Sequence, residues 1–281
     1  MTTATATASL ELKVDDRAFR RLASVVEQHL GIRLPDEKRP LVVRRMRSLV
    51  LSSGARDLGE WVDRHLQRAP TPALLSELAD ALTTNHTFFW REPDHFEHLR
   101  DHALRDRLAA KAQQRDLRVW CAAAATGEEP YQLAMILRDG VPAGWQAGLL
   151  ATDVSAKALQ AARAGRYPAD RLEGLPKPWH RWVALDADGG HGTIRDELRR
   201  DVTFRRLNLV RDRWPFRAPF DIVFCRNVLI YFDPPVRDKV VGGIVSQLAV
   251  GGYLYVGHSE SVPAGKWPLA GVASGVWRKV G

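Results

Sequence analysis

The sequence predicts an α/β protein with a mainly parallel sheet, preceded by a small all-helical domain. Between residues 15 and 67, apolar residues recur with the 3.6-residue period of amphipathic helices. From residue 117 onward, short apolar runs alternate instead with helical segments. Strands separated by helices form βαβ units, in which the strands are parallel and helices cover the sheet. The 281 residues suffice for two domains, each with its own core.

The N-terminal domain, assigned to residues 11–72, contains a basic amphipathic helix. The stretch "EKRPLVVRRMRSLV" (37–50) combines an apolar face at helical spacing with a run of positive charges. Its candidate docking residues for an acidic partner are Arg39, Arg44, Arg45 and Arg47. An ordinary solvent-exposed helix face explains the same charges about as well. Pro70 and Pro72 interrupt the helical pattern and predict a domain boundary there, with a further helix before Thr83.

The second domain, residues 73–281, carries the sheet. The apolar runs at 117–123, 147–153, 202–207 and 220–226 are predicted strands. A helix is expected to begin near Glu129, and another spans 155–165, where Gly165 is a typical helix C-cap. The tail differs, because 251–260 and 274–280 are joined by a loop without helical pattern, which predicts an antiparallel pair at one edge. Residues 171–200 match neither pattern and are interpreted as a small inserted element.

Composition restricts the function classes. The formal charge of +8 and the isoelectric point of about 9.8 favour an acidic partner without choosing among nucleic acid, lipid and protein. No secretory signal and no apolar run long enough to span a membrane is present, so neither export nor membrane insertion is expected. Cys121 and Cys225 both lie inside predicted strands, which is typical of buried thiols in a reducing, cytoplasmic compartment.

The turn after the first predicted strand, "AAAATGEEP" (122–130), argues against a bound phosphate. A dinucleotide site needs several glycines, whereas this turn has only Gly127, and its glutamates would repel a phosphate at the helix start. Pro130 restricts Glu129 to an extended conformation near the strand end. Asp153 ends the second strand, where nucleotide folds place an acidic residue on ribose hydroxyls. Two carboxylates without a phosphate cradle suggest S-adenosylmethionine, although a carboxylate at a helix N-terminus can simply complement the helix dipole.

Five motifs in a fixed order, with a short "LNL" (207–209) among them, resemble the CheR-type chemoreceptor glutamate methyltransferases. They are "NHTFFWREPDHF" (85–96), "TGEEPYQLAM" (126–135), "ATDVSAKALQAARAGRY" (151–167), "FCRNVLIYFD" (224–233) and "GGYLYVGHSES" (251–261). The resemblance covers nearly the whole chain, including the helical domain. It implies a Rossmann-like class I methyltransferase sheet with an inserted small antiparallel β-subdomain at about 171–200. The chain departs from the family at Ala123–Ala125, where Gly-Cys-Ser is usual, and at Trp90, where a second Phe is usual.

The resemblance also implies roles for individual residues. The implied S-adenosylmethionine-binding residues are Asn85, Thr87, Arg91, Glu129, Asp153, Asn208, Leu209, Arg226 and Asn227. The implied catalytic residues are Arg91 and Tyr231. Each has a structural alternative: Asn85 and Thr87 could cap a helix, Arg226 could be a surface charge, and Tyr231 could be a core aromatic.

The implied reaction moves a methyl group from S-adenosylmethionine to glutamate side chains of a chemoreceptor's cytoplasmic helices, leaving S-adenosylhomocysteine. A glutamate is already ionised at neutral pH, because its unperturbed pKa is about 4.3, so no general base is required. The protein's task is then positioning. Arg91 is the candidate clamp for the accepting carboxylate, although it could instead hold the carboxylate of the cofactor.

Two other functions compete with this interpretation. A nucleic-acid methyltransferase would suit the basic isoelectric point, but "DPPV" (233–236) lies too far from the fourth strand for the D-P-P-Y motif of such enzymes, and Pro234 and Pro235 are expected to start a helix. A cofactor-binding regulatory module without catalysis is the second alternative. We expect a monomer without nucleic acid, and no metal site, because His95 and His98 lack further ligands at suitable spacing.

Overall fold

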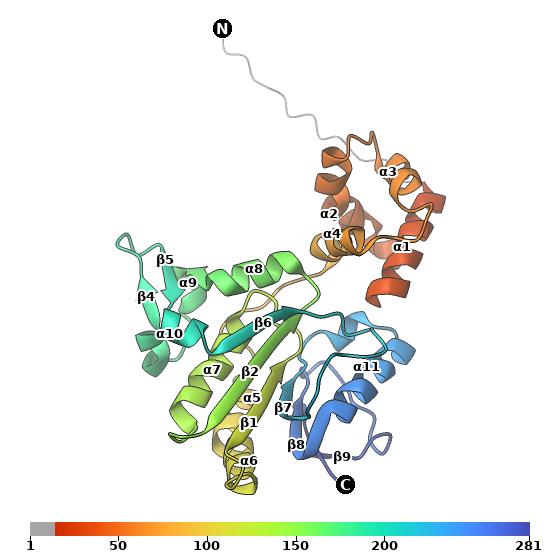
Figure 1. Ribbon diagram of the computed structural model, residues 1–281. Helices are drawn as coiled ribbons and strands as arrows, with labels where there is room; N and C mark the ends of the chain where they lie inside the picture. The colour runs from red at the N-terminus through yellow and green to blue at the C-terminus, as the bar shows by residue number, and fades with distance from the viewer. Residues whose placement is uncertain (1–14) are drawn as a thin grey trace. The chain divides into compact units, whose positions relative to one another are not determined.

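A computed structural model describes residues 15–281 of the chain (Figure 1), so the predicted start of the first domain at residue 11 lies outside the described residues. The chain divides after Thr83 into two compact units. Within the described residues, no helix is both long enough and apolar enough to cross a membrane.

The first unit consists of helices, as its apolar period predicts. They are α1 (Asp16–Leu30), α2 (Arg39–Ser52), α3 (Leu58–His65) and α4 (Pro72–Leu82), with a short 3₁₀ turn at Asp36–Lys38 before α2. Asp15, Asp57 and Thr71 cap the N-termini of α1, α3 and α4 by accepting a hydrogen bond from a backbone N–H in the first turn. Each cap begins a helix whose apolar stripe is buried in this unit, so local sequence and packing agree.

The boundary predicted at residue 72 was wrong. Helix α4 contacts α1 and α2, and its Leu78, Ala79 and Leu82 are buried. Pro72 occupies the first turn of α4, where a missing N–H costs nothing, so this proline starts a helix and does not separate domains. The helical unit therefore ends at Thr83 and the α/β unit begins at Thr84.

The basic helix α2 buries its apolar face as expected, through Val42, Met46 and Val50. Of the four candidate docking arginines, Arg44 and Arg47 are exposed. Arg45 instead donates a hydrogen bond to the backbone oxygen of Leu82 at 2.7 Å, and thereby satisfies a carbonyl at the end of α4.

Arg39 is held by contacts within the helical unit. Its guanidinium pairs with Asp16 at 2.6 Å and with Asp36 at 2.7 Å, and it lies over the ring of Phe19. These contacts tie the start of α2 to α1. Arg44 and Arg47 are therefore the two arginines of the set that the fold presents most openly.

The second unit is built on a seven-stranded sheet with the strand order β6-β2-β1-β7-β8-β10-β9. Its strands are β1 (Asp116–Cys121), β2 (Gln146–Asp153), β6 (Val202–Arg206), β7 (Phe220–Phe224), β8 (Leu248–Tyr255), β9 (Leu269–Ala273) and β10 (Val276–Lys279). The first five strands in this order, β6, β2, β1, β7 and β8, pair in parallel. Strand β10 pairs antiparallel with both β8 and β9. The predicted antiparallel edge is confirmed, but the outermost strand β9 was missed.

Helices cover both faces of this sheet (Figure 1). One core cluster joins the sheet to α5 (Pro93–His98), α6 (Leu104–Ala110), α7 (Glu128–Gly140) and α8 (Ala156–Ala164), with a π-helical turn at Leu99–Ala103 between α5 and α6. The other cluster joins the opposite face to α11 (Pro234–Gln247), which Pro234 and Pro235 begin as predicted. Gly165 adopts the left-handed conformation that ends α8, also as predicted.

The small antiparallel β-subdomain is present and lies between β2 and β6 along the chain. Its strands β3 (Arg166–Pro168), β4 (Val183–Leu185) and β5 (His191–Ile194) are arranged in the order β3-β5-β4. They are accompanied by α9 (Ala169–Leu172), a 3₁₀ segment at Lys177–Trp182 and α10 (Asp196–Arg199). The subdomain begins at Arg166, earlier than the expected 171, because β3 directly follows α8.

Candidate functional site

Several of the predicted site residues lie at the carboxyl ends of the parallel strands. The connection from β1 to α7 is a tight turn in which two residues adopt left-handed backbone conformations, Ala125 with φ of 46° and Gly127 with φ of 101°. Ala124 N–H donates to the oxygen of Thr152 at 2.8 Å, so the turn lies against the end of β2. Parallel strand ends of this kind are where open α/β sheets bind ligands.

Gly127 cannot be replaced without strain. A Cβ at this position would lie 2.8 Å from the hydroxyl of Tyr167 and 2.9 Å from Cβ of Ala162. We predict that Gly127→Ala lowers the free energy of unfolding by about 1–3 kcal/mol, because it adds a steric clash to an unfavourable φ. Urea denaturation followed by circular dichroism measures this. Gly189→Ala is the matched control, since Gly189 has a φ of 69° but open space around its Cα; equal losses in both variants would contradict the clash.

Asp153 lies at the end of β2 and connects two turns. One carboxylate oxygen accepts a hydrogen bond from Ala125 N–H at 2.9 Å, and the other accepts from Ser155 N–H at 2.9 Å. The side chain is held against the β1–α7 turn, and the residue is 8% exposed. Because an ionised carboxylate only accepts hydrogen bonds, a ligand beside Asp153 must offer donors, as ribose hydroxyls do.

Glu129, in the first turn of α7, forms an ion pair with Arg226. The distance from Arg226 Nη1 to Glu129 Oε2 is 2.8 Å, and Cys121 Sγ–H donates to the other carboxylate oxygen at 3.2 Å. Burial raises the pKa of Glu129, and Arg226 offsets part of this effect. The sequence placed Glu129 near a strand end correctly, but the extended conformation predicted from Pro130 was wrong, because Glu129 already lies in α7. Only the fold shows that Arg226, at the end of β7, is its partner.

Arg226 also binds Glu92. Its Nη2 lies 3.0 Å from Glu92 Oε2, and the same nitrogen donates to the backbone oxygen of Arg91. Asn227 Nδ2 donates to Glu92 Oε1 at 3.0 Å. Burial alone would raise the pKa of Glu92, but the hydrogen bond from Asn227 and the charge of Arg226 outweigh it, and the net pKa is lowered. Arg226 is 5% exposed, so it is not a surface charge.

Glu260 holds the backbone after β7. Its carboxylate accepts hydrogen bonds from the backbone N–H groups of Gly257, Asn227, Leu229 and Ile230, at distances of 2.7, 2.8, 2.6 and 3.3 Å. These bonds stabilise Asn227 in a left-handed conformation, with φ of 56°. They also hold the 3₁₀ turn Leu229–Tyr231, in which the half-buried Tyr231 lies.

Arg91 lies in the segment before α5 and is half-buried. Its Nη1 donates to the backbone oxygen of His86 at 3.0 Å, and its guanidinium lies over the ring of Phe88, which is 45% exposed. Trp90 adopts a left-handed conformation with φ of 65°, and its ring packs on Phe96 and on Trp179 of the β-subdomain. The unusual tryptophan thus connects the Arg91 segment to the subdomain.

Asn85 and Thr87 are half-buried and do not cap α5, because Glu92 is the residue before that helix. Thr87 O accepts a hydrogen bond from Arg171 at 2.7 Å, and Arg171 also pairs with the fully buried Glu128 at 2.5 Å. Burial raises the pKa of Glu128. Arg171 therefore links the segment of Thr87 to the start of α7.

Asn208 and Leu209 follow β6. Asn208 Oδ1 accepts a hydrogen bond from Val210 N–H at 3.1 Å, which forms an Asx turn. Leu209 is 6% exposed and belongs to the core on the α11 face. The structure thus brings Arg226, Asn227, Glu129 and the backbone of Arg91 into one network, with Asp153 on the adjacent strand end.

Sequence reasoning missed three residues of this neighbourhood, namely Glu92, Arg171 and Glu260. Glu92 directly follows Arg91 in the motif at 85–96, and Glu260 lies in the motif at 251–261, so their positions in these motifs could have identified both residues. Their partners were not predictable, since each contacts groups far along the chain.

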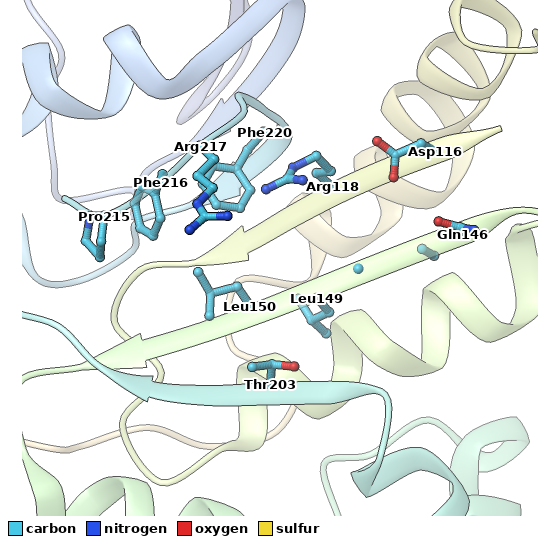
Figure 2. A pocket seen from close by; sticks show the side chains of 12 residues that line it. Asp116, Arg118, Gln146, Leu149, Leu150, Thr203, Pro215, Phe216, Arg217 and Phe220 are labelled. Carbon is cyan, nitrogen blue, oxygen red and sulfur yellow. The ribbon is translucent and has the colours of Figure 1, made fainter. Parts of the chain in front are cut away.

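A separate cavity of about 640 Å³ lies away from the carboxyl ends of the strands, beside the amino-terminal parts of β1 and β2 (Figure 2). Phe216, Arg217 and Phe220 line one side, and Leu150 and Thr203 line the other. None of the predicted site residues lines this cavity, because they follow the carboxyl ends of the strands.

Comparison with known families agrees with this geometry. Residues 85–272 match the model "CheR methyltransferase, SAM binding domain", and residues 17–83 match "CheR methyltransferase, all-alpha domain". The chain belongs to the CheR methyltransferase family. The boundary between the two matches coincides with the division of the structure after Thr83.

Relatives that share the name chemotaxis protein methyltransferase span most of the chain. The protein from Borreliella burgdorferi is 33% identical over 264 residues, which are 92% of this chain and 93% of the relative. The one from Escherichia coli is 36% identical over 256 residues, 89% of this chain and 86% of the relative. Chemotaxis protein methyltransferase 1 from Pseudomonas aeruginosa is 38% identical over 253 residues, 87% of this chain and 90% of the relative.

The cofactor of this CheR family member is S-adenosylmethionine. The residues at the strand ends fit it chemically. Asp153 and Glu129 are hydrogen-bond acceptors, which suit hydroxyls and a positively charged sulfonium, and the charge of Arg226 is balanced by two carboxylates. The small side chains of Ala123 and Ala125, which are partly exposed, would permit close approach by a ligand, whereas Ala124 is buried in the core.

Proposed function

We propose that this protein methylates glutamate side chains on the cytoplasmic helices of a chemoreceptor, forming glutamyl methyl esters. Its membership of a family of chemotaxis methyltransferases supports this, and so does the arginine-rich surface of an overall basic chain. The observation that carries the proposal is Arg91, whose half-buried guanidinium donates to one backbone oxygen and lies over one aromatic ring. Such a group suits an incoming carboxylate.

The cofactor, when bound, would supply an electrophilic methyl group. Asp153 and Glu129 would hold the nucleoside, and Arg226 keeps Glu129 in place. Arg91 would clamp the accepting carboxylate and position it for transfer. Glu260 fixes the turn that presents Tyr231. No residue needs to remove a proton, because the acceptor is already ionised at neutral pH.

The test of this function is incubation with isotopically labelled cofactor and recombinant receptor cytoplasmic helices, followed by alkaline treatment. Carboxyl methyl esters release labelled methanol in base, whereas N-methyl products do not. We expect release from the receptor and none from a receptor whose candidate glutamates are alanine. Label that remains in the protein or in added nucleic acid after alkali would reject the proposal.

A partner surface is proposed on α2. The acidic receptor helices would bind Arg44 and Arg47, the exposed arginines of that helix. Arg44→Glu together with Arg47→Glu should reduce receptor methylation at least tenfold at low ionic strength and leave S-adenosylhomocysteine affinity unchanged. Initial rates at several salt concentrations measure this, because an electrostatic contact weakens with salt.

The matched control is Arg17→Glu with Arg20→Glu, which makes the same charge change on exposed positions of α1. Arg45 is excluded from the test because its bond to Leu82 supports the fold. If the α1 variant loses as much activity as the α2 variant, general charge explains the effect and α2 is not the docking surface.

A further inference from the structure

Glu92, His95 and His258 converge at the edge of the site, from two segments that are far apart along the chain. Glu92 directly precedes α5, His95 lies within it, and His258 follows β8. One potential ligand atom from each lies within 4.8 Å of the other two. We propose that these three residues form a binding site for a divalent transition-metal ion of the zinc class.

The buried imidazole of His95 is the strongest argument. His95 is fully buried; its Nε2 lies 3.1 Å from the backbone oxygen of Ser274, and its Nδ1 lies 3.5 Å from Glu92 Oε2. Nδ1 makes no hydrogen bond to any described residue. A neutral imidazole has one proton, yet this ring faces an acceptor on each side. A cation placed between Nδ1 and the carboxylate removes the repulsion between the two lone pairs.

The surrounding hydrogen bonds match those of metal-binding histidines. Such a histidine donates its second ring N–H to a carbonyl or a carboxylate, which fixes the ring and its tautomer. His95 Nε2 has the oxygen of Ser274 as this partner. His258 Nε2 lies 3.0 Å from Asp94 Oδ1, which leaves Nδ1, 3.3 Å from Ser274 Oγ, for the ion.

The local charge also favours a cation. Asp94 contacts His258, and Glu92 shares Arg226 with Glu129 and shares Asn227 with Glu260. Among the described residues joined by these bonds, four are carboxylates and Arg226 is the one arginine. Glu92 would share its carboxylate between Arg226 and the ion. Arg226 would keep its bonds to Glu129 and to the oxygen of Arg91.

Two imidazoles and a carboxylate are a ligand set typical of zinc and of neighbouring transition metals, with bonds of about 2.0–2.2 Å. The three ligand atoms must move closer together to reach such distances. His258 can supply this movement, because its side chain is 39% exposed. An ion here would join α5 to the loop after β8, directly beside the network of Arg226.

Zinc titration of the intact protein, after treatment with a chelator, tests the proposal. We expect one site per chain in a competition assay with a chromophoric chelator, and His258→Gln should weaken it at least tenfold. Because bound metal stabilises the folded state, zinc should also raise the melting temperature of the parent protein and not of His258→Gln. Since His258 is exposed, the variant should fold.

His102→Gln is the matched control. His98 and His102 lie one helical turn apart with ring centroids 5.2 Å from each other, so they could bind zinc as a surface pair. The proposal predicts that His102→Gln leaves the site intact. Equal zinc affinity in the parent protein and His258→Gln, or loss of binding in His102→Gln alone, would overturn it.

Discussion

Arg91→Ala should reduce methyl transfer by at least a thousandfold while the fold stays intact. In the structure, Arg91 Nη1 donates to the oxygen of His86, and the guanidinium lies over Phe88. Neither contact is an ion pair, in contrast to Arg226, which pairs with both Glu92 and Glu129. Removing Arg91 therefore removes the group proposed to align the acceptor. Alignment of reacting groups can lower the activation barrier by several kcal/mol.

Single-turnover transfer of a labelled methyl group to receptor helices measures the effect, with circular dichroism as the test of folding. Arg91→Lys should recover only a small part of the rate, because lysine cannot bind a carboxylate through two parallel hydrogen bonds. Arg100→Ala is the control, since Arg100 is an exposed arginine of the same unit that pairs with Asp101. Retained turnover in Arg91→Ala would show that its role was assigned incorrectly.

Calorimetry with S-adenosylhomocysteine separates the two roles implied for Arg91. If the guanidinium holds the receptor carboxylate, the affinity for the cofactor product is unchanged. If it holds the carboxylate of the cofactor instead, the affinity falls together with the rate. The first result is expected, because the proposed function assigns Arg91 to the receptor carboxylate.

Asp153→Ala should weaken S-adenosylhomocysteine binding by about 10- to 100-fold, because hydrogen bonds to a charged group contribute about 1.5–3 kcal/mol. The substitution removes the acceptor proposed for ribose hydroxyls. It also leaves the backbone N–H groups of Ala125 and Ser155 without their present partner, so the β1–α7 turn loses one of its connections to β2 and keeps the bond from Ala124 N–H to the oxygen of Thr152.

Asp153→Asn tests the direct contact more finely. It keeps the size of the side chain, but its NH₂ group must face one of the two backbone donors, so binding should weaken in this variant too. Calorimetric titration measures both affinities. Asp212→Ala is the control, because Asp212 is an exposed carboxylate that pairs with Lys239. An unchanged affinity in Asp153→Ala would remove Asp153 from the cofactor site.

Several elements were predictable because local sequence specifies them. Gly165 ends α8, and Pro234 begins α11, because only a few residue types fit those backbone positions. Pro72 shows the limit of such reasoning. It breaks the preceding pattern in any fold, but whether α4 belongs to the first or the second unit depends on which core buries Leu82, and that is a tertiary property.

The candidate site shows the same division. Glu129 and Asp153 could be placed at strand ends, because strand and helix periods locate the turns between them. The partners of Arg226 could not be predicted, because Glu92 is 134 residues away and Glu129 is 97 residues away along the chain. Periodicity reports which face of an element is buried and does not report which elements become neighbours.

By itself, the sequence determined the parallel sheet with its preceding helices, the acceptor-rich turn after β1, and motifs that together resemble one family. The tertiary structure decided the domain boundary, the edge strand β9, the capping role of Arg45 and the meeting of Glu92, His95 and His258. The physical reason is the range of the interactions. Capping and periodicity act over a few residues, whereas ion pairs and strand order depend on how distant segments pack.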